Sequence, residues 1–157
     1  MYKKVLVPLD GSKLAECVLP HVERLAEGGM VKEIVLLRVC DSPSIIADYP
    51  EGKNKTWEKH VERITSNAQQ TCSLYIEDIE KDLKDKGFKV KSDSCLGRPA
   101  EEIVSYANKN KVDLIVMASH GRSGVSRWAY GSVAEKVLRS TCVPVLLVKA
   151  PGCVTGF

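Results

Sequence analysis

The sequence lacks the signatures of several large classes of protein. No apolar run approaches the ~20 residues that span a bilayer, and no basic and apolar leader precedes the first expected strand. The glycine-rich P-loop of many nucleoside triphosphatases, G-x4-G-K-[ST], is also missing. We therefore expect a cytoplasmic protein that neither spans a membrane nor uses P-loop chemistry.

Cysteine is present, but not at the spacings that usually make it functional. The chain has six cysteines, with no C-x-x-C pair and no cluster of histidine and cysteine at metal-ligand spacing. From this pattern we expect neither a protein-held metal cluster nor a redox site. Cys40 follows an expected strand, and we interpret it as a buried structural thiol, with a redox-sensitive thiol as the alternative.

A strong charge of either sign is also missing. The net charge is +3 over 157 residues, and acidic residues stand beside most of the lysines. No basic stripe indicates a nucleic acid as a partner. The length predicts one domain over 1–157, large enough to bury a single good core.

Apolar segments alternate with segments of helical periodicity, which predicts an α/β fold. We expect a single-domain, doubly wound (Rossmann-like) parallel sheet with helices on both faces. Its ligand would bind beyond the carboxyl ends of the strands. The expected strands are 3–9, 33–39, 89–96, 112–117 and 143–148.

The segments between these strands carry their own signals. Pro20 lies inside the first expected helix and should kink it, and the long helix over 56–86 should end at Gly87. Two segments fall outside the regular elements. They are a loop over 41–55, which we expect to be mobile, and a C-terminal tail over 149–157.

A loop suited to phosphate follows the fourth expected strand. It contains Gly121 and, after nine further residues, Gly131. Arg122 and Arg127 lie between these glycines and would neutralise phosphate oxygens. Small residues that let the backbone approach, together with fixed cations, predict a nucleotide as the ligand.

The helix after this loop is expected to begin at Ser132. Ser132 and Glu135 have the spacing of a capping box, in which each side chain accepts a hydrogen bond from a backbone N–H group. The remaining N–H groups and the helix dipole favour an anion at this end. The same residues equally fit a helix cap with no ligand.

Several motifs, in order along the chain, resemble the universal stress protein family, and the resemblance covers essentially the whole chain. They are 4–12 (KVLVPLDGS), 97–99 (GRP), 119–124 (SHGRSG), 131–137 (GSVAEKV) and 144–145 (PV). The nucleotide-binding branch of that family carries G-x2-G-x9-G-[ST], which Gly121, Gly131 and Ser132 match. Ala118 stands where the first glycine is expected. If that glycine serves only close approach, a methyl group is tolerated; if it needs a positive φ, alanine weakens binding.

The resemblance implies a five-stranded sheet in the order 3-2-1-4-5 and a site for ATP, with or without Mg²⁺ bound through phosphates and Ser132. Asp10 would contact the adenosine and Val39 would pack on the adenine, while the loop and the helix start would hold ribose and phosphates. The residues implied are Pro8, Leu9, Asp10, Val39, Met117, Ala118, His120, Gly121, Gly131, Ser132 and Val133. Arg122 and Arg127 join them for their charge.

The last expected strand, 143–148, would be a hydrophobic sheet edge if left unpaired. The resemblance implies that it pairs with its counterpart in a homodimer. The interpretation we favour is thus an ATP-binding regulatory protein of the stress response, acting as a nucleotide-responsive dimer and not as an enzyme.

Two other functions stay open, a nucleotide-free protein that acts through its dimer surface and a slow ATPase. His120 is a weak candidate for a general base because the sequence offers no orienting partner. Residues 10–12 (DGS) equally fit a turn and helix cap. A receiver domain would need several acids after the first strand, where only Asp10 stands.

Overall fold

A computed structural model of the chain describes residues 1–42, 55–120 and 130–150. Within these ranges five parallel strands form one sheet in the order β3-β2-β1-β4-β5, as expected. The strands are β1 (Tyr2–Leu9), β2 (Val31–Cys40), β3 (Val90–Leu96), β4 (Leu114–Ala118) and β5 (Val145–Val148). Strands β3 and β5 are its edges, so the expected edge position of 89–96 is confirmed.

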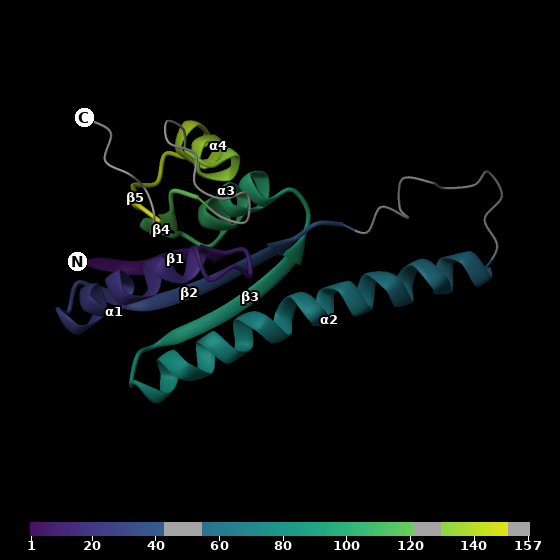
Figure 1. The fold of residues 1–157 in the computed structure, drawn as a ribbon, viewed down its shortest axis with the longest axis horizontal. Helices are drawn as coiled ribbons and strands as arrows, with labels where there is room; N and C mark the ends of the chain where they lie inside the picture. Colours follow the sequence, from purple (N-terminus) through teal and green to yellow (C-terminus); the bar gives the residue numbers. More distant parts are fainter. Residues whose placement is uncertain (43–54, 121–129, 151–157) are drawn as a thin grey trace.

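Helices cover both faces of the sheet, and each face has its own core (Figure 1). The helices are the 3-10 turn η1 (Ala15–Val18), α1 (Leu19–Glu27), α2 (Lys55–Asp85), α3 (Pro99–Lys109) and α4 (Ser132–Ser140). Val5 and Val7 of β1 pack toward α1 and α2, whereas Leu6 packs toward α3 and α4. This alternation follows from the period of two along a strand.

Pro20 does not kink a helix, contrary to the sequence-based expectation. The chain first makes η1, and α1 begins at Leu19, which places Pro20 in the first turn. A backbone N–H group in the first turn has no acceptor within the helix, so a proline there costs no hydrogen bond. The fixed φ of proline also suits the helix. Pro20 therefore helps to start α1.

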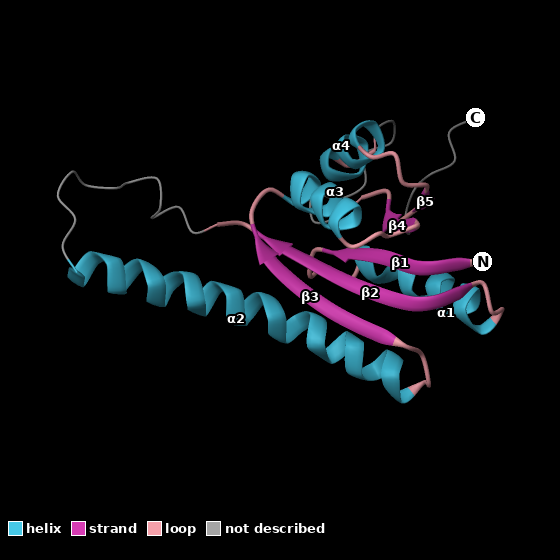
Figure 2. Cartoon of the chain, turned by 180° about the vertical axis from the view of Figure 1, so that it is seen from behind, coloured by secondary structure: helices cyan, strands magenta, loops and turns pink. Residues whose placement is uncertain are grey.

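Helix α2 is longer than the sheet that it covers. Its buried residues, Cys72, Ile76 and Leu83, all lie in its second half. The first turns pass beyond the ends of the strands (Figure 2). After Asp85 the chain turns at Gly87 with φ of +89°, a backbone conformation that favours glycine, as expected for the end of this helix.

Parts of three expected segments lie outside the described residues. These are most of the loop over 41–55, the stretch 121–129 of the glycine loop, and residues 151–157 of the tail. Of the tail, Lys149 is exposed and Ala150 is buried. No helix in the described ranges is long and apolar enough to cross a membrane.

Candidate functional site

A cavity of about 250 Å³ lies where β1, β2 and β4 end and α3 and α4 begin. This volume is just below the ~300–1,000 Å³ common for small-molecule sites. Most of the expected site residues line it, namely Pro8, Leu9, Asp10, Val39, Met117, Ala118, His120, Gly131, Ser132 and Val133. The expected residues Gly121, Arg122 and Arg127 lie outside the described residues.

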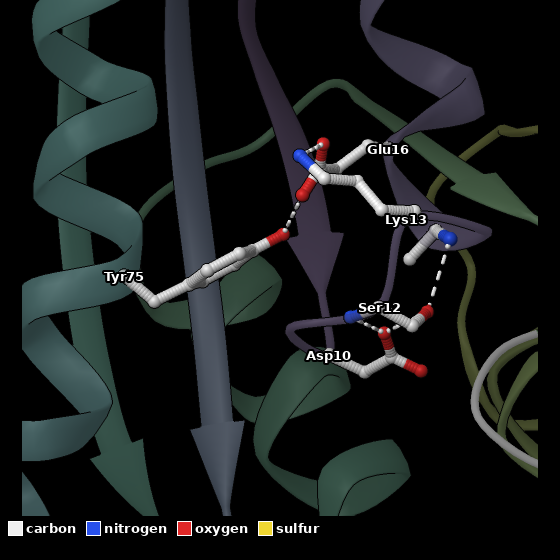
Figure 3. Close-up of polar contacts among 6 residues, drawn as sticks. Asp10, Ser12, Lys13, Glu16 and Tyr75 are labelled. Carbon is white, nitrogen blue, oxygen red and sulfur yellow. Dashed lines mark hydrogen bonds and ion pairs between the residues drawn. The ribbon is translucent and has the colours of Figure 1, made fainter.

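Asp10 lines the cavity from a tight turn at the end of β1 (Figure 3). One of its carboxylate oxygens accepts hydrogen bonds from the backbone N–H of Ser12, at 2.9 Å, and from the Ser12 hydroxyl, at 2.6 Å. The Ser12 hydroxyl oxygen in turn accepts the N–H of Ala15 at 3.2 Å. Gly11, with φ of +87°, makes the turn possible. Turn, cap and cavity wall are therefore compatible roles for 10–12.

The chain after this turn is fastened to α2. Glu16 accepts a hydrogen bond from the Tyr75 hydroxyl at 2.8 Å and forms an ion pair with Lys13 at 2.8 Å (Figure 3). The Arg38 guanidinium lies 4.7 Å from the centre of the Tyr75 ring, a cation–π arrangement. Burial, and next the hydrogen bond to Glu16, raise the pKa of Tyr75 above its ordinary value. The network therefore holds Tyr75 protonated and the loop after β1 in place.

Ser119, which is absent from the sequence-based set of site residues, joins β4, β5 and the start of α4. Its backbone N–H donates to Val148, and its carbonyl accepts from the N–H of Gly131, both at 2.8 Å. Its hydroxyl lies 3.0 Å from Nδ1 of His120 and accepts the N–H of Ala150 at 3.2 Å. Ser119 and His120 are both buried. Ser119 thus gives His120 an orienting partner from the neighbouring position in the chain.

The expected capping box at Ser132 is wrong. Gly131 is the N-cap of α4, and Ser132 is its first helical residue, with an exposed side chain. Glu135 forms an ion pair with Arg139 at 2.8 Å. Because Gly131 has no side chain, the N-cap residue itself offers no acceptor to the first-turn N–H groups, which lie at the edge of the cavity. Such groups and the helix dipole attract anions.

Ala118 is the last residue of β4 and pairs with Val148 of β5. Within the described ranges Lys111 is the one non-glycine residue with a positive φ, so the backbone of Ala118 has the ordinary sign. The position therefore does not require glycine for its conformation. Of the two effects expected for this alanine, only the space taken by its methyl group remains.

Some lining residues were absent from the sequence-based set, namely Ala15, Leu37, Asp41, Pro99, Ile103, Ser119 and Ala134. Two local rules would have found several of them. Leu37 and Asp41 share the face of Val39, because alternate residues of an extended chain point the same way. Pro99 and Ile103 lie one helical turn apart at the start of α3.

Cys40 is not the structural thiol that we expected. It forms a disulfide with Cys72 of α2, with 6.2 Å between their Cα atoms. The two residues are 32 positions apart, so only the packing of α2 against β2 brings them together. Cys17, Cys95 and Cys142 are not in disulfides. In the part of the chain that the structure describes, no three metal-ligating side chains form a metal site.

Comparison with known proteins assigns the fold to a family. The sequence model of the universal stress protein family matches residues 1–149. The chain belongs to the universal stress protein family. It is 36% identical to the universal stress protein MJ0577 of Methanocaldococcus jannaschii over 156 residues, which cover 95% of this chain and 96% of that relative.

Solved structures agree with the family assignment. The structure of MJ0577 has a TM-score of 0.81 with this chain and covers 97% of it, this chain covering 99% of MJ0577. An Arabidopsis thaliana family protein with AMP bound has a TM-score of 0.63 at 14% identity, with 96% and 93% covered. A universal stress protein in complex with cAMP has a TM-score of 0.57 at 19% identity, with 95% and 98% covered. At such identities the last two share the fold.

Proposed function

We propose that this member of the family binds an adenine nucleotide, ATP in the first place, in the cavity between β1, β4 and α4. It would act in the cytoplasm as a regulatory protein of the stress response whose homodimer responds to the nucleotide. The observation that carries this proposal is the meeting of Asp10, an apolar wall and the start of α4 in one cavity.

The two ends of the cavity suit the two ends of a nucleotide. Val39, Ile103 and Met117 give an apolar surface on which a base can stack. The Asp10 carboxylate is an acceptor suited to ribose hydroxyls. The N–H groups after Gly131 and the Ser132 hydroxyl suit phosphate oxygens, and that hydroxyl is also a ligand that Mg²⁺ accepts.

Two relatives by fold support an adenine nucleotide as the ligand. One is bound to AMP and the other to cAMP. Both ligands share the adenine and ribose with ATP and differ in the phosphates. We therefore expect the base and ribose contacts to be common to all three, and the contacts at α4 to discriminate among them.

Calorimetry with ATP, AMP and cAMP tests the proposal, together with native mass spectrometry of the purified protein for a co-purified nucleotide. Ser132→Ala removes a hydroxyl at the start of α4 and should weaken ATP binding about fivefold, the effect of roughly one hydrogen bond. Ser140→Ala, at the exposed end of the same helix, should leave it unchanged. No binding of any of these nucleotides at millimolar concentration would favour the nucleotide-free alternative.

The homodimer part of the proposal rests on β5. This strand is an edge of the sheet, and Leu146 on it is 40% exposed, so an apolar edge is left to be covered. Leu146→Glu should dissociate the dimer, as light scattering would report. Leu138→Glu changes a leucine of equal exposure, 39%, on α4 and should not. A wild-type protein that is monomeric at micromolar concentration contradicts the dimer.

A further inference from the structure

The Cys40–Cys72 disulfide lies directly behind the wall of the cavity. Cys40 is the last residue of β2 and is half-buried, while Cys72, in the second half of α2, has no exposed surface. The bond thus fastens the carboxyl end of β2 to α2. In the described part of the chain it is the covalent link between the sheet and a helix.

The residues on either side of Cys40 belong to the cavity. Val39 and Asp41 both line it, and the backbone carbonyl of Cys40 accepts the N–H of Gly97 at 2.9 Å. Because neighbouring side chains of a strand point to opposite faces, Cys40 reaches α2 while Val39 reaches the cavity. Whatever holds or releases Cys40 therefore acts on the backbone that carries two cavity residues.

We propose that Cys40 and Cys72 form a reversible thiol–disulfide exchange site, and that the disulfide raises the affinity of the cavity for its nucleotide. The second half of this inference rests on the nucleotide binding proposed above; the first half rests only on the cytoplasmic location proposed there. In the cytoplasm, thiol pools reduce most disulfides, and those that form are commonly transient and redox-sensing. The co-substrate is a low-molecular-weight disulfide, and glutathione disulfide is the probe.

The exchange balances in two steps. The Cys40 thiolate, the more accessible of the two, attacks one sulfur of glutathione disulfide and releases one glutathione thiolate. The Cys72 thiolate then attacks the Cys40 sulfur of this mixed disulfide and releases the second. The protein loses two protons and two electrons, and two molecules of glutathione carry them away. Reduction is the reverse, with the external thiolate attacking at Cys40.

The direction of the coupling follows from the position of the bond. The disulfide removes freedom from the last residue of β2, so Val39 and Asp41 are already fixed when the ligand arrives. In the dithiol, strand pairing and the contact of Arg38 with Tyr75 hold this end without a covalent link. Linkage requires that a nucleotide bound more tightly by the oxidised protein also favours oxidation by the same factor.

Cys95 serves as the matched control thiol. Cys95 lies in the neighbouring strand β3, where it pairs with Val39 of β2. It packs on the opposite face of the sheet from Cys40. Burial raises its pKa to about 11, so little thiolate forms at neutral pH. It is therefore near the cavity wall and should take no part in the exchange.

The first experiment measures the exchange itself. The full chain carrying Cys142→Ser and Cys153→Ser, which remove an exposed thiol and one outside the described residues, is equilibrated in graded ratios of oxidised to reduced glutathione. After acid quenching and alkylation, peptide mass spectrometry should find Cys40 and Cys72 cross-linked in oxidising buffers and both alkylated in reducing ones. Cys95 should stay outside any disulfide. A Cys40–Cys72 link that never forms, or that no reductant opens, overturns the proposal.

The second experiment measures the coupling. The dissociation constant for ATP should be at least about fivefold lower for the oxidised than for the reduced protein, the usual lower range of coupling between sites. Cys72→Ala and Cys40→Ser should each abolish this difference, and Cys95→Ala should keep it. Saturating ATP should shift the oxidised-to-reduced ratio of the wild-type pair by the same factor.

The outcomes separate the two proposals. Equal ATP affinity in both redox states, with the exchange observed, overturns the coupling and leaves nucleotide binding standing. No ATP binding in either state removes the proposed function and the coupling with it, while the mass spectra still report the exchange site. Tighter ATP binding by the reduced protein contradicts the direction of coupling that was argued from the position of the disulfide.

Discussion

The two faces of the sheet are closed in different ways at the carboxyl ends of the strands. On the face of α1 and α2, the Cys40–Cys72 bond, the cation–π contact of Arg38 with Tyr75, and the Tyr75–Glu16 hydrogen bond tie α2 to the end of β2 and to η1. On the face of α3 and α4, the cavity of about 250 Å³ remains. The strands are shared, so the difference comes from the helices.

This contrast indicates that the two faces of the sheet have different roles. On the face of α1 and α2, the polar and covalent contacts hold the ends of β1 and β2. The face of α3 and α4 uses those ends, with Asp10 and Val39 among them, as the wall of a site. Apart from the Cys40–Cys72 bond, which acts on the backbone of two cavity residues, changes on the first face should act mainly on stability, and changes on the second mainly on ligand affinity.

The largest effect is expected from Ile76→Ala on α2. Ile76 is 1% exposed and lies in the core of the first face, so its truncation should lower the free energy of unfolding by about 3 kcal/mol. Denaturant titration measures this. Leu74→Ala, two residues away and 58% exposed, should change it by less than about 0.5 kcal/mol. If a folded Ile76→Ala variant bound ATP several times more weakly than the wild type, the two faces would not have these separate roles.

Gly131→Val should have the next largest effect, this time on affinity. The branched side chain would enter the space at the start of α4 that the proposal gives to phosphates, and should weaken ATP binding at least about a hundredfold, some 2.7 kcal/mol. With φ of −57° and ψ of 147°, the backbone at Gly131 accepts any residue, so strain is not the cause. Gly131→Ser, a smaller side chain and a good N-cap, should lose less. Unchanged affinity in a folded valine variant means that the glycine serves the turn alone.

Tyr75→Phe should cost about 1.5 kcal/mol of stability at neutral pH, because it leaves the Glu16 carboxylate without this donor. The pKa of Tyr75 is raised in the fold from 10.0, chiefly by burial. Its contribution is therefore complete below about pH 10 and is lost as the pH rises above it, since the unfolded tyrosine ionises first. Denaturant titrations at pH 8 and at about pH 11 should show a smaller alkaline loss for Tyr75→Phe than for the wild type.

Tyr106 gives the matching measurement on the other face. Burial, followed by the nearby Asp93, raises its pKa to about 12. Tyr106→Phe should likewise reduce the alkaline loss of stability, by the same linkage. An alkaline loss that neither phenylalanine variant reduces would show that other groups control this pH range.

Sequence periodicity was enough to predict the strands and most of the helices, because strands and helices repeat locally with known spacing, whereas the order of the strands in the sheet came from the family resemblance. The resemblance also named most of the cavity residues, which lie together because strand ends and helix starts meet at one edge of such a fold. What it missed depends on packing or on a shift of one residue. The partner of Cys40 lies 32 positions away, and the N-cap of α4 is Gly131 where Ser132 was expected.

Ser119 was missed for a related reason. Its hydroxyl and backbone tie together β5, α4 and His120, and none of these partners except its neighbour is close in sequence. A serine after a buried strand has many possible roles, and the fold selects among them. Pro20 was misplaced because apolar periodicity continues through the 3-10 turn that precedes α1.

The smallest expected effect is that of Ala118→Gly, which restores the glycine of the family motif. Because Ala118 has an ordinary φ and sits in β4, the glycine relieves no backbone strain and only removes a methyl group from the cavity wall. ATP affinity should therefore rise slightly or stay the same, within about fivefold, or about 1 kcal/mol. Stability should fall by roughly 0.5–1 kcal/mol, since glycine is more flexible in the unfolded chain and weakens a strand.

Calorimetry and denaturant titration on the same preparation read both effects of Ala118→Gly, and Ala134→Gly provides the control. Ala134 also lines the cavity but lies in α4, where glycine costs a similar stability without restoring a motif. A gain in affinity far above fivefold at 118 alone would mean that the methyl group blocks the ligand in the natural chain. That result would favour the nucleotide-free interpretation, in which the cavity on the face of α3 and α4 is closed to ATP by the methyl group of Ala118.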